Sequence, residues 1–172
     1  MKELLDKLSS YNIFNYLFPG VLFAAIGEHL SSYSLILDDI IIGVFVYYFY
    51  GLVISRIGSL FLEPVFKWAH IIHFMPYADF VNASKIDNKI ELFSEVNNMY
   101  RTLCSLFICL LLLRFFEFIE KLCPNISEYS LLIAIFIFAL LFIFSYRKQT
   151  DYITSRITQA IQSKNAKERN GQ

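Results

Sequence analysis

Polar and basic residues able to bind a phosphorylated ligand precede the third apolar stretch of this 172-residue chain. If the segment is helical, Asn97, Asn98 and Arg101 share one face, because residues three and four apart are neighbours on a helix. Amides and a guanidinium of this kind bind phosphates and base edges, and aromatic rings stack on bases. The alternative is that the amides bond an adjacent helix. The candidate ligand-binding residues are Lys85, Lys89, Asn97, Asn98, Tyr100 and Arg101.

Charged residues inside or beside the apolar stretches are candidates for controlling an ion path. Arg114 and Glu117 are three residues apart within the third stretch. Ionised side chains at membrane depth pair with one another or mark ion pathways, so the two form either an ion pair reaching the headgroups or a pore lining. In the first loop, Glu28, Asp38 and Asp39 would attract cations as a ring in a symmetric oligomer. In a monomer they would form a solvated loop.

The first apolar stretch has features of a gate. Pro19 precedes a glycine, which predicts a kinked or broken helix because proline removes a helix hydrogen bond. Such a break persists at membrane depth where protein or water satisfies the freed carbonyl. Residues 2–8 are amphipathic, a pattern typical of a surface anchor or of a mobile plug. The candidate pore and gate residues are Leu4, Leu5, Leu8, Asn15, Pro19, Glu28, Asp38, Asp39, Arg114 and Glu117.

The sequence gives little support to an enzyme. It contains no nucleophile elbow, no zinc-protease helix motif and no glycine loop that would cradle phosphates. The three cysteines have neither the spacing of a metal site nor that of a disulfide framework. We therefore expect no catalytic residue, no metal ion and no cofactor.

The composition is that of a membrane protein. Hydrophobic residues make up 56% of the chain and charged residues 17%, against about 45–50% and 25% in soluble domains. Residues 8–27, 40–55, 102–113 and 129–146 carry no charge. The third stretch is short, but residues 103–119 include twelve Leu, Ile or Phe. These contribute roughly −4 to −7 kcal/mol to insertion, against at most about 2.5–3.5 kcal/mol each for Arg114 and Glu117. Four spans are expected.

The basic residues predict how these spans are oriented. With four spans, thirteen of the fifteen Lys and Arg residues lie on one side, which the positive-inside rule places in the cytoplasm. A third stretch lying flat in the interface would break this sorting. The chain then divides into an amphipathic N-terminal helix (1–10), a transmembrane hairpin (11–62), a cytoplasmic helical segment (63–101), a second hairpin (102–147) and a cytoplasmic C-terminal helix with a disordered tail (148–172).

Apolar periodicity predicts helical extensions outside the membrane. Residues 64–74 are amphipathic, and their helix is expected to end before Pro76. Asp87 is a plausible cap for a helix that continues unbroken into the third span. In the tail, Ile153, Ile157 and Ile161 form a stripe that extends the fourth helix. The expected fold is an all-α membrane protein with four transmembrane helices and cytoplasmic helical extensions, in a homo-oligomeric bundle.

The segments YNIFNYLFPGVLF (11–23) and YADFVNASKIDNKIELFSEVNNMYRT (77–102) resemble small bacterial membrane proteins encoded beside antiphage defence genes. The chain resembles the membrane effectors of the Hailong system and, more distantly, the membrane-pore proteins encoded with type VI CRISPR systems. The Hailong resemblance implies a homo-oligomeric inner-membrane channel, with a tetramer favoured. It also implies closure by single-stranded oligonucleotides from a partner nucleotidyltransferase, depolarisation on opening, and a plug formed by the N-terminal helix.

Two hypotheses follow from the sequence. The first is a ligand-gated pore whose oligomer lines water with the kinked first span and the tyrosine-rich second span. The second is a non-conducting scaffold in the bilayer that docks a cytoplasmic partner protein through the segment between the second and third spans.

Overall fold

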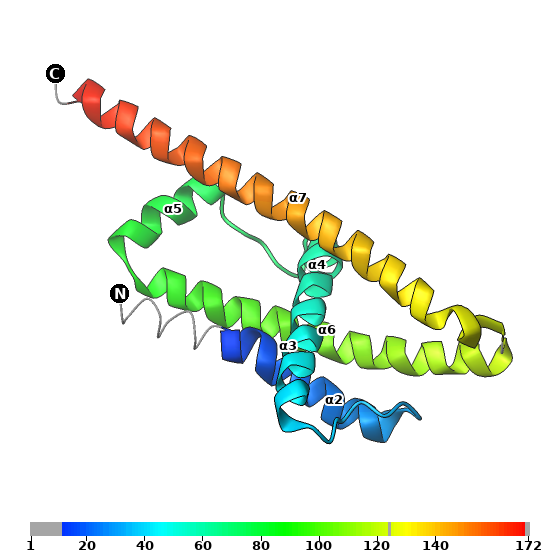
Figure 1. The fold of residues 1–172 in the computed structure, drawn as a ribbon. Coiled ribbons are helices and arrows are strands. Elements are labelled where there is room, and N and C mark those ends of the chain that lie inside the picture. The colour runs from blue at the N-terminus through cyan, green and yellow to red at the C-terminus, as the bar shows by residue number, and fades with distance from the viewer. Residues whose placement is uncertain (1–11, 124, 171–172) are drawn as a thin grey trace.

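The computed structural model describes residues 12–123 and 125–170, so the candidate gate residues Leu4, Leu5 and Leu8 lie outside the described part. Every regular element within that part is a helix (Figure 1). The elements are η1 (Ile13–Leu17), α2 (Phe18–Leu30), α3 (Ile40–Ile57), η2 (Gly58–Leu62), α4 (Glu63–Trp68), α5 (Tyr77–Ile86), α6 (Lys89–Leu122) and α7 (Asn125–Asn170), where η denotes a π-helical turn.

Within the described residues, four helical segments are long and apolar enough to cross a membrane, as the sequence predicts. They are Ile13–Leu30, Ile40–Trp68, Lys89–Leu122 and Asn125–Gln162. The third includes all of α6, which runs without a break through the apolar stretch whose length was marginal. At 1.5 Å per residue, 34 residues span about 51 Å, more than the roughly 30 Å of hydrocarbon.

Pro19 is accommodated by a change of helix type. Residues Ile13–Leu17 form a π-helical turn, in which Phe18 donates its N–H to the carbonyl of Ile13, and Pro19 then lies in the first turn of α2. Proline is tolerated in a first turn because the N–H it lacks has no partner within the helix there. A second π-turn, η2, leads into α4, where Pro64 occupies the same position. The break predicted at Pro19 is thus a π-turn followed by an α-helix, and the same arrangement recurs at Pro64.

Glycines bring the first two spans into backbone contact. A Cβ added at Gly20 would overlap the carbonyl oxygen of Tyr47, and one added at Gly51 would overlap that of Tyr16. At the start of η2, a Cβ at Gly58 would lie 3.3 Å from the Arg101 carbonyl of α6. Small residues allow this close approach between membrane helices.

A small core joins α3 to the middle of α6. Leu106 is fully buried, packed with Ile54, Cys109 and Leu110. Ser105, the residue before Leu106, donates to the Ile54 carbonyl at 2.8 Å, a bond between two candidate spans.

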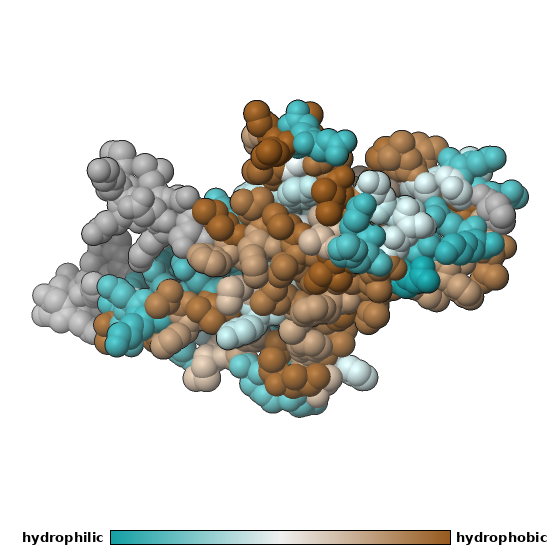
Figure 2. Space-filling view, turned by 90° about the horizontal axis from the view of Figure 1, so that it is seen from below, coloured by the Kyte–Doolittle hydropathy of each residue, from teal (hydrophilic) through white to brown (hydrophobic). Residues whose placement is uncertain are grey.

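The last helix packs sparsely on the rest of the chain. α7 has 46 residues and separates from α6 beyond their shared turn (Figure 1). Phe49 of α3 makes ring contacts with Phe138 and Phe142, and α5 lies against the outer part of α7. Among the described side chains of α7, only Leu141 and Ser145 are buried. Hydrophobic side chains also cover much of the middle of the face seen in Figure 2.

Three local predictions need correction or refinement. α4 ends at Trp68, well before Pro76, because His70 has φ 57° and Ile71 N–H bonds back to the Phe66 carbonyl at 2.9 Å. That left-handed residue with a six-to-one bond is a Schellman stop. The N-cap residue of α6 is Asn88, whose side chain makes no capping bond, rather than the predicted Asp87; Asp87 Oδ1, one residue earlier, accepts from the Lys89 N–H at 2.9 Å. α7 continues to Asn170, into the segment expected to be disordered.

Candidate functional site

Four charged residues from three helices meet at one end of the bundle. The carboxylate of Glu63 lies 2.9 Å from Lys67 Nζ, 2.7 Å from Arg101 Nη1 and 3.6 Å from Lys148 Nζ. We call Glu63, Lys67, Arg101 and Lys148 the basic cluster, and the end of the bundle that holds them the basic end. Three cationic groups here face one carboxylate, leaving two positive charges in excess.

Local structure explains how the basic cluster forms. The π-turn η2 ends at Leu62, and Glu63 then opens α4 with Lys67 one turn later. Close packing at Gly58 brings α6 alongside, with Arg101 at the contact. Lys148 of α7 donates to the Ser59 carbonyl at 2.6 Å and to its Oγ at 2.9 Å. Two salt bridges and these bonds tie α6 and α7 to the junction of η2 and α4.

The basic cluster retains unused capacity to bind an anion. The Glu63 side chain is only 7% exposed, whereas Lys67 and Lys148 are partly accessible. Arg101 Nε is buried and has no hydrogen-bond partner among the described residues. A buried donor without a partner costs about 1–3 kcal/mol, so an acceptor placed there would be stabilised.

Aromatic rings border the basic cluster. Lys67 Nζ lies 4.6 Å from the centre of the Phe74 ring, and Lys148 Nζ lies 5.8 Å from that of Tyr152. Tyr77 at the start of α5 is in ring contact with Tyr152 at 6.2 Å. Cations over aromatic faces are held by the ring quadrupole. These contacts connect α5 and the loop before it to the basic end.

A second ionic group lies at the opposite end of α6, which we call the loop end. Glu117 is buried and accepts from Ser32 Oγ and Lys121 Nζ, each at 2.7 Å, and from Arg114. The ion pair expected between Arg114 and Glu117 is therefore formed. Tyr33 donates to Glu120 beside it. Burial, with that bond to a carboxylate, raises the pKa of Tyr33 to about 12.

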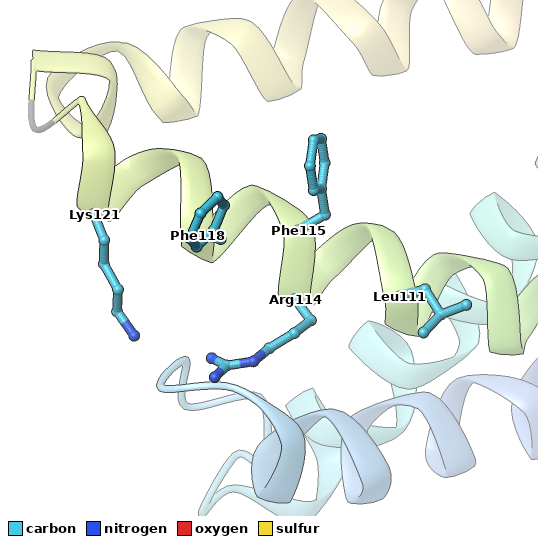
Figure 3. A pocket seen from close by; sticks show the side chains of 5 residues that line it. All are labelled: Leu111, Arg114, Phe115, Phe118 and Lys121. Atoms are coloured by element: carbon cyan, nitrogen blue, oxygen red, sulfur yellow. The ribbon is translucent and has the colours of Figure 1, made fainter.

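A hollow of about 420 Å³ lies along α6 at the loop end (Figure 3). Arg114 and Lys121 extend from the same side of α6 toward α2 and the loop after it, while Phe115 points away from them (Figure 3). The Arg114 side chain is 55% exposed despite its ion pair. An exposed guanidinium thus stands beside an open hollow within a candidate span.

Two of the three carboxylates predicted to form a ring, Glu28 near the end of α2 and Asp39 before α3, accept hydrogen bonds from nearby backbone N–H groups. Glu28 accepts from the backbone N–H groups of Leu35 and Ile36 at 2.5 and 3.1 Å. Asp39 caps α3 through bonds from Ile41 and Ile42 at 2.8 and 3.0 Å. Asp38 is exposed. The predicted carboxylate ring requires several copies of the chain and stays a prediction.

The predicted ligand residues do not meet at one point. Arg101 belongs to the basic cluster, whereas Lys89 lies twelve residues earlier, about 18 Å along α6. Lys85, Lys89, Asn97 and Tyr100 are exposed, and Asn98 is partly exposed. The sequence reasoning missed Glu63, Lys67 and Lys148. Their positions in the sequence could have identified them, because each is charged and flanks an apolar stretch on the side predicted to be cytoplasmic.

Among the predicted pore residues in the first span, Asn15 and Pro19 are both buried within the subunit. Asn15 lies in η1, one turn before Pro19 in α2, and both elements pack on α3 and α6.

Comparison with known proteins yields no match: no family model matches the sequence, no curated protein is similar to it, and no solved structure matches its fold.

Proposed function

We propose that the chain is the subunit of an oligomeric membrane channel, with its basic end in the cytoplasm. The observation that carries this proposal is the position of Arg114. It lies about 10 Å from Lys121 along α6, within a candidate span, and is more than half exposed beside a hollow. A charged group at membrane depth faces a protein interior or a water-filled path. Neighbouring copies of the chain would supply that path.

The predicted ligand surface supports control from the basic end. Lys85, Lys89, Asn97 and Tyr100 are exposed around α5 and the first half of α6. Basic, amide and aromatic groups together suit a nucleotide or an oligonucleotide. In the proposed function such a ligand gates the channel. The resemblance to antiphage effectors supports a role in defence, in which opening depolarises the bacterial inner membrane.

The test is conduction by the purified full-length protein in planar bilayers. We expect single-channel currents under a KCl gradient. Arg114→Gln removes a positive charge from the path, so it should move the reversal potential toward that of K⁺. The matched control is Arg156→Gln, an exposed residue of α7 beyond the apolar stretch. Bilayers that stay silent both with and without single-stranded oligonucleotide would contradict the channel.

A silent bilayer would favour a scaffold that docks a partner protein. That function has its own support in the large apolar side chains around α4 and α5. Trp68 is 82% exposed and Ile86 is 88% exposed. Both lie at helix ends beyond the basic cluster, where exposed apolar side chains are candidates for protein contact.

A further inference from the structure

An apolar groove leads into the membrane from the basic cluster. It has a volume of about 440 Å³ and lies between the η2–α4 junction, α6 and α7. Its walls are almost wholly apolar, with Phe61 and Val65 on one side, Ile108 and Leu112 on α6, and Phe144 on α7. The groove exists because α7 separates from α6 after their turn (Figure 1), while η2 packs on α6 and α3 packs on α7, and Glu63 at the start of α4 pairs with both helices at the basic end.

The mouth of this groove coincides with the basic cluster on all three elements. Ser105, at the groove's end on α6, follows Arg101 by one turn. Phe144 precedes Lys148 by one turn on α7, and Val65 precedes Lys67 by two residues on α4. A molecule in the groove would therefore place its upper end among three cations.

The positive charges of the basic cluster favour a molecule with an anionic headgroup. The basic cluster has two positive charges in excess, and Lys67 and Lys148 are accessible. The buried Nε of Arg101 still lacks an acceptor among the described residues. Phosphate oxygens accept from guanidinium and ammonium groups with strong, charge-assisted hydrogen bonds. Basic pockets between transmembrane helices bind the headgroups of anionic lipids.

The dimensions suit one acyl chain. From Ser105 to Leu112 the groove covers about 10 Å of α6, and a single leaflet's hydrocarbon is about 15 Å thick. Arg101 lies about 30 Å from Lys121 along α6, so the two ionic groups stand at the two surfaces of a bilayer. A headgroup at the basic cluster is thus at headgroup depth.

We propose that the groove and the basic cluster together form a binding site for an anionic glycerophospholipid. Its phosphate lies against Lys67, Arg101 and Lys148, and one acyl chain fills the groove between α6 and α7. A free phosphate or nucleotide would use the cations and leave the apolar walls unfilled. The bound lipid would join α4, α6 and α7, and it requires no conduction by the protein.

The experiment measures lipid binding by the full-length protein, delipidated in detergent. Phosphatidylglycerol and phosphatidylcholine with identical palmitoyl and oleoyl chains are titrated, and bound lipid is counted by native mass spectrometry. We expect phosphatidylglycerol to bind and to raise the thermal midpoint more than phosphatidylcholine does. Inorganic phosphate and a short single-stranded oligonucleotide are titrated alongside as soluble anions.

Two pairs of variants distinguish the contribution of the lipid headgroup to binding from that of the acyl chain. Lys148→Gln should weaken phosphatidylglycerol binding about fivefold, the worth of one cation near the surface. Arg147→Gln, its exposed neighbour outside the basic cluster, should not. Leu140→Trp fills the groove and should reduce binding of the same lipid, whereas Ile143→Trp on the exposed side of α7 should leave it unchanged.

The groove variants keep the test decisive if Lys148→Gln fails to fold, because they leave the basic cluster intact. Equal binding of the two lipids would overturn the proposal. So would binding that is insensitive to Leu140→Trp. Phosphate or oligonucleotide that binds as tightly as the lipid, unaffected by Leu140→Trp, would also overturn it and assign the cluster to a soluble anion.

Discussion

Glu63 alone supplies the negative charge that the three cations of the basic cluster share. Its carboxylate is the common partner of Lys67, Arg101 and Lys148, and it is almost fully buried. Buried ion pairs add little net stability over apolar packing, but loss of one partner leaves the others uncompensated. At this site three cations from three helices would then repel one another.

Glu63→Gln should therefore destabilise the protein. The partners are partly exposed, so we expect a loss of about 2–3 kcal/mol, below the 3–5 kcal/mol found for fully buried pairs. The control is Glu91→Gln, an exposed acid in the first turn of α6. Thermal unfolding in detergent measures both variants, and equal midpoints would contradict the role of Glu63.

Among the elements, the closest packing is that of η1 and α2 on α3. Two glycines allow this packing, because Gly20 contacts the backbone of Tyr47 and Gly51 contacts the backbone of Tyr16. Backbone atoms cannot move aside as a flexible side chain can, so any Cβ at these positions must separate the helices. Gly43, on the same helix as Gly51, instead faces the ring of Tyr47, with the nearest atom 3.3 Å from an added Cβ.

The two glycines of α3 should respond to alanine in opposite ways. Gly51→Ala should cost about 3 kcal/mol through overpacking. Gly43→Ala should be neutral or stabilising by up to about 1 kcal/mol, because alanine favours the helix and the Tyr47 ring can shift. Thermal midpoints of the two variants, made in parallel, measure the difference. A harmless Gly51→Ala would contradict the packing between these spans.

The long helices could be predicted from the sequence, whereas some helix ends and the contacts between helices could not. Unbroken apolar runs dictate helices in lipid, so the four spans and the continuous α6 could be read directly. The end of α4 at Trp68 could not be predicted from the sequence. It depends on the left-handed backbone conformation of His70, which this residue type does not require. Arg101 was recognised as a candidate, but its contacts with Glu63 and Lys148 are set by tertiary packing across long separations in the sequence.

Across the whole molecule, ionic groups sit at opposite ends of the apolar helices. Ser32 of the first loop meets Glu117 near the end of α6, while α4, the start of the third span and Lys148 meet at the basic end. Both hairpin turns thus lie at one end. A chain that crosses a bilayer four times must have this arrangement.

The orientation of that arrangement can be measured by cysteine labelling in spheroplasts. In a variant with the three native cysteines replaced, Lys89→Cys should be protected from a membrane-impermeant maleimide until the membrane is permeabilised. Ser34→Cys, exposed in the first loop, should react at once. The opposite pattern would place the basic end outside the cell and overturn both the proposed channel orientation and the cytoplasmic ligand.

α7 extends far beyond the basic cluster, so a change in its tilt moves its far end by a larger distance. From Lys148 to Asn170 the helix continues for about 33 Å past the basic cluster. A rigid rod pivoting at Lys148 by about 10° moves its far tip by about 6 Å, from simple geometry on that length. If the apolar half of α7 crosses a bilayer, a small change in its tilt is therefore accompanied by a displacement of several ångströms at the far tip.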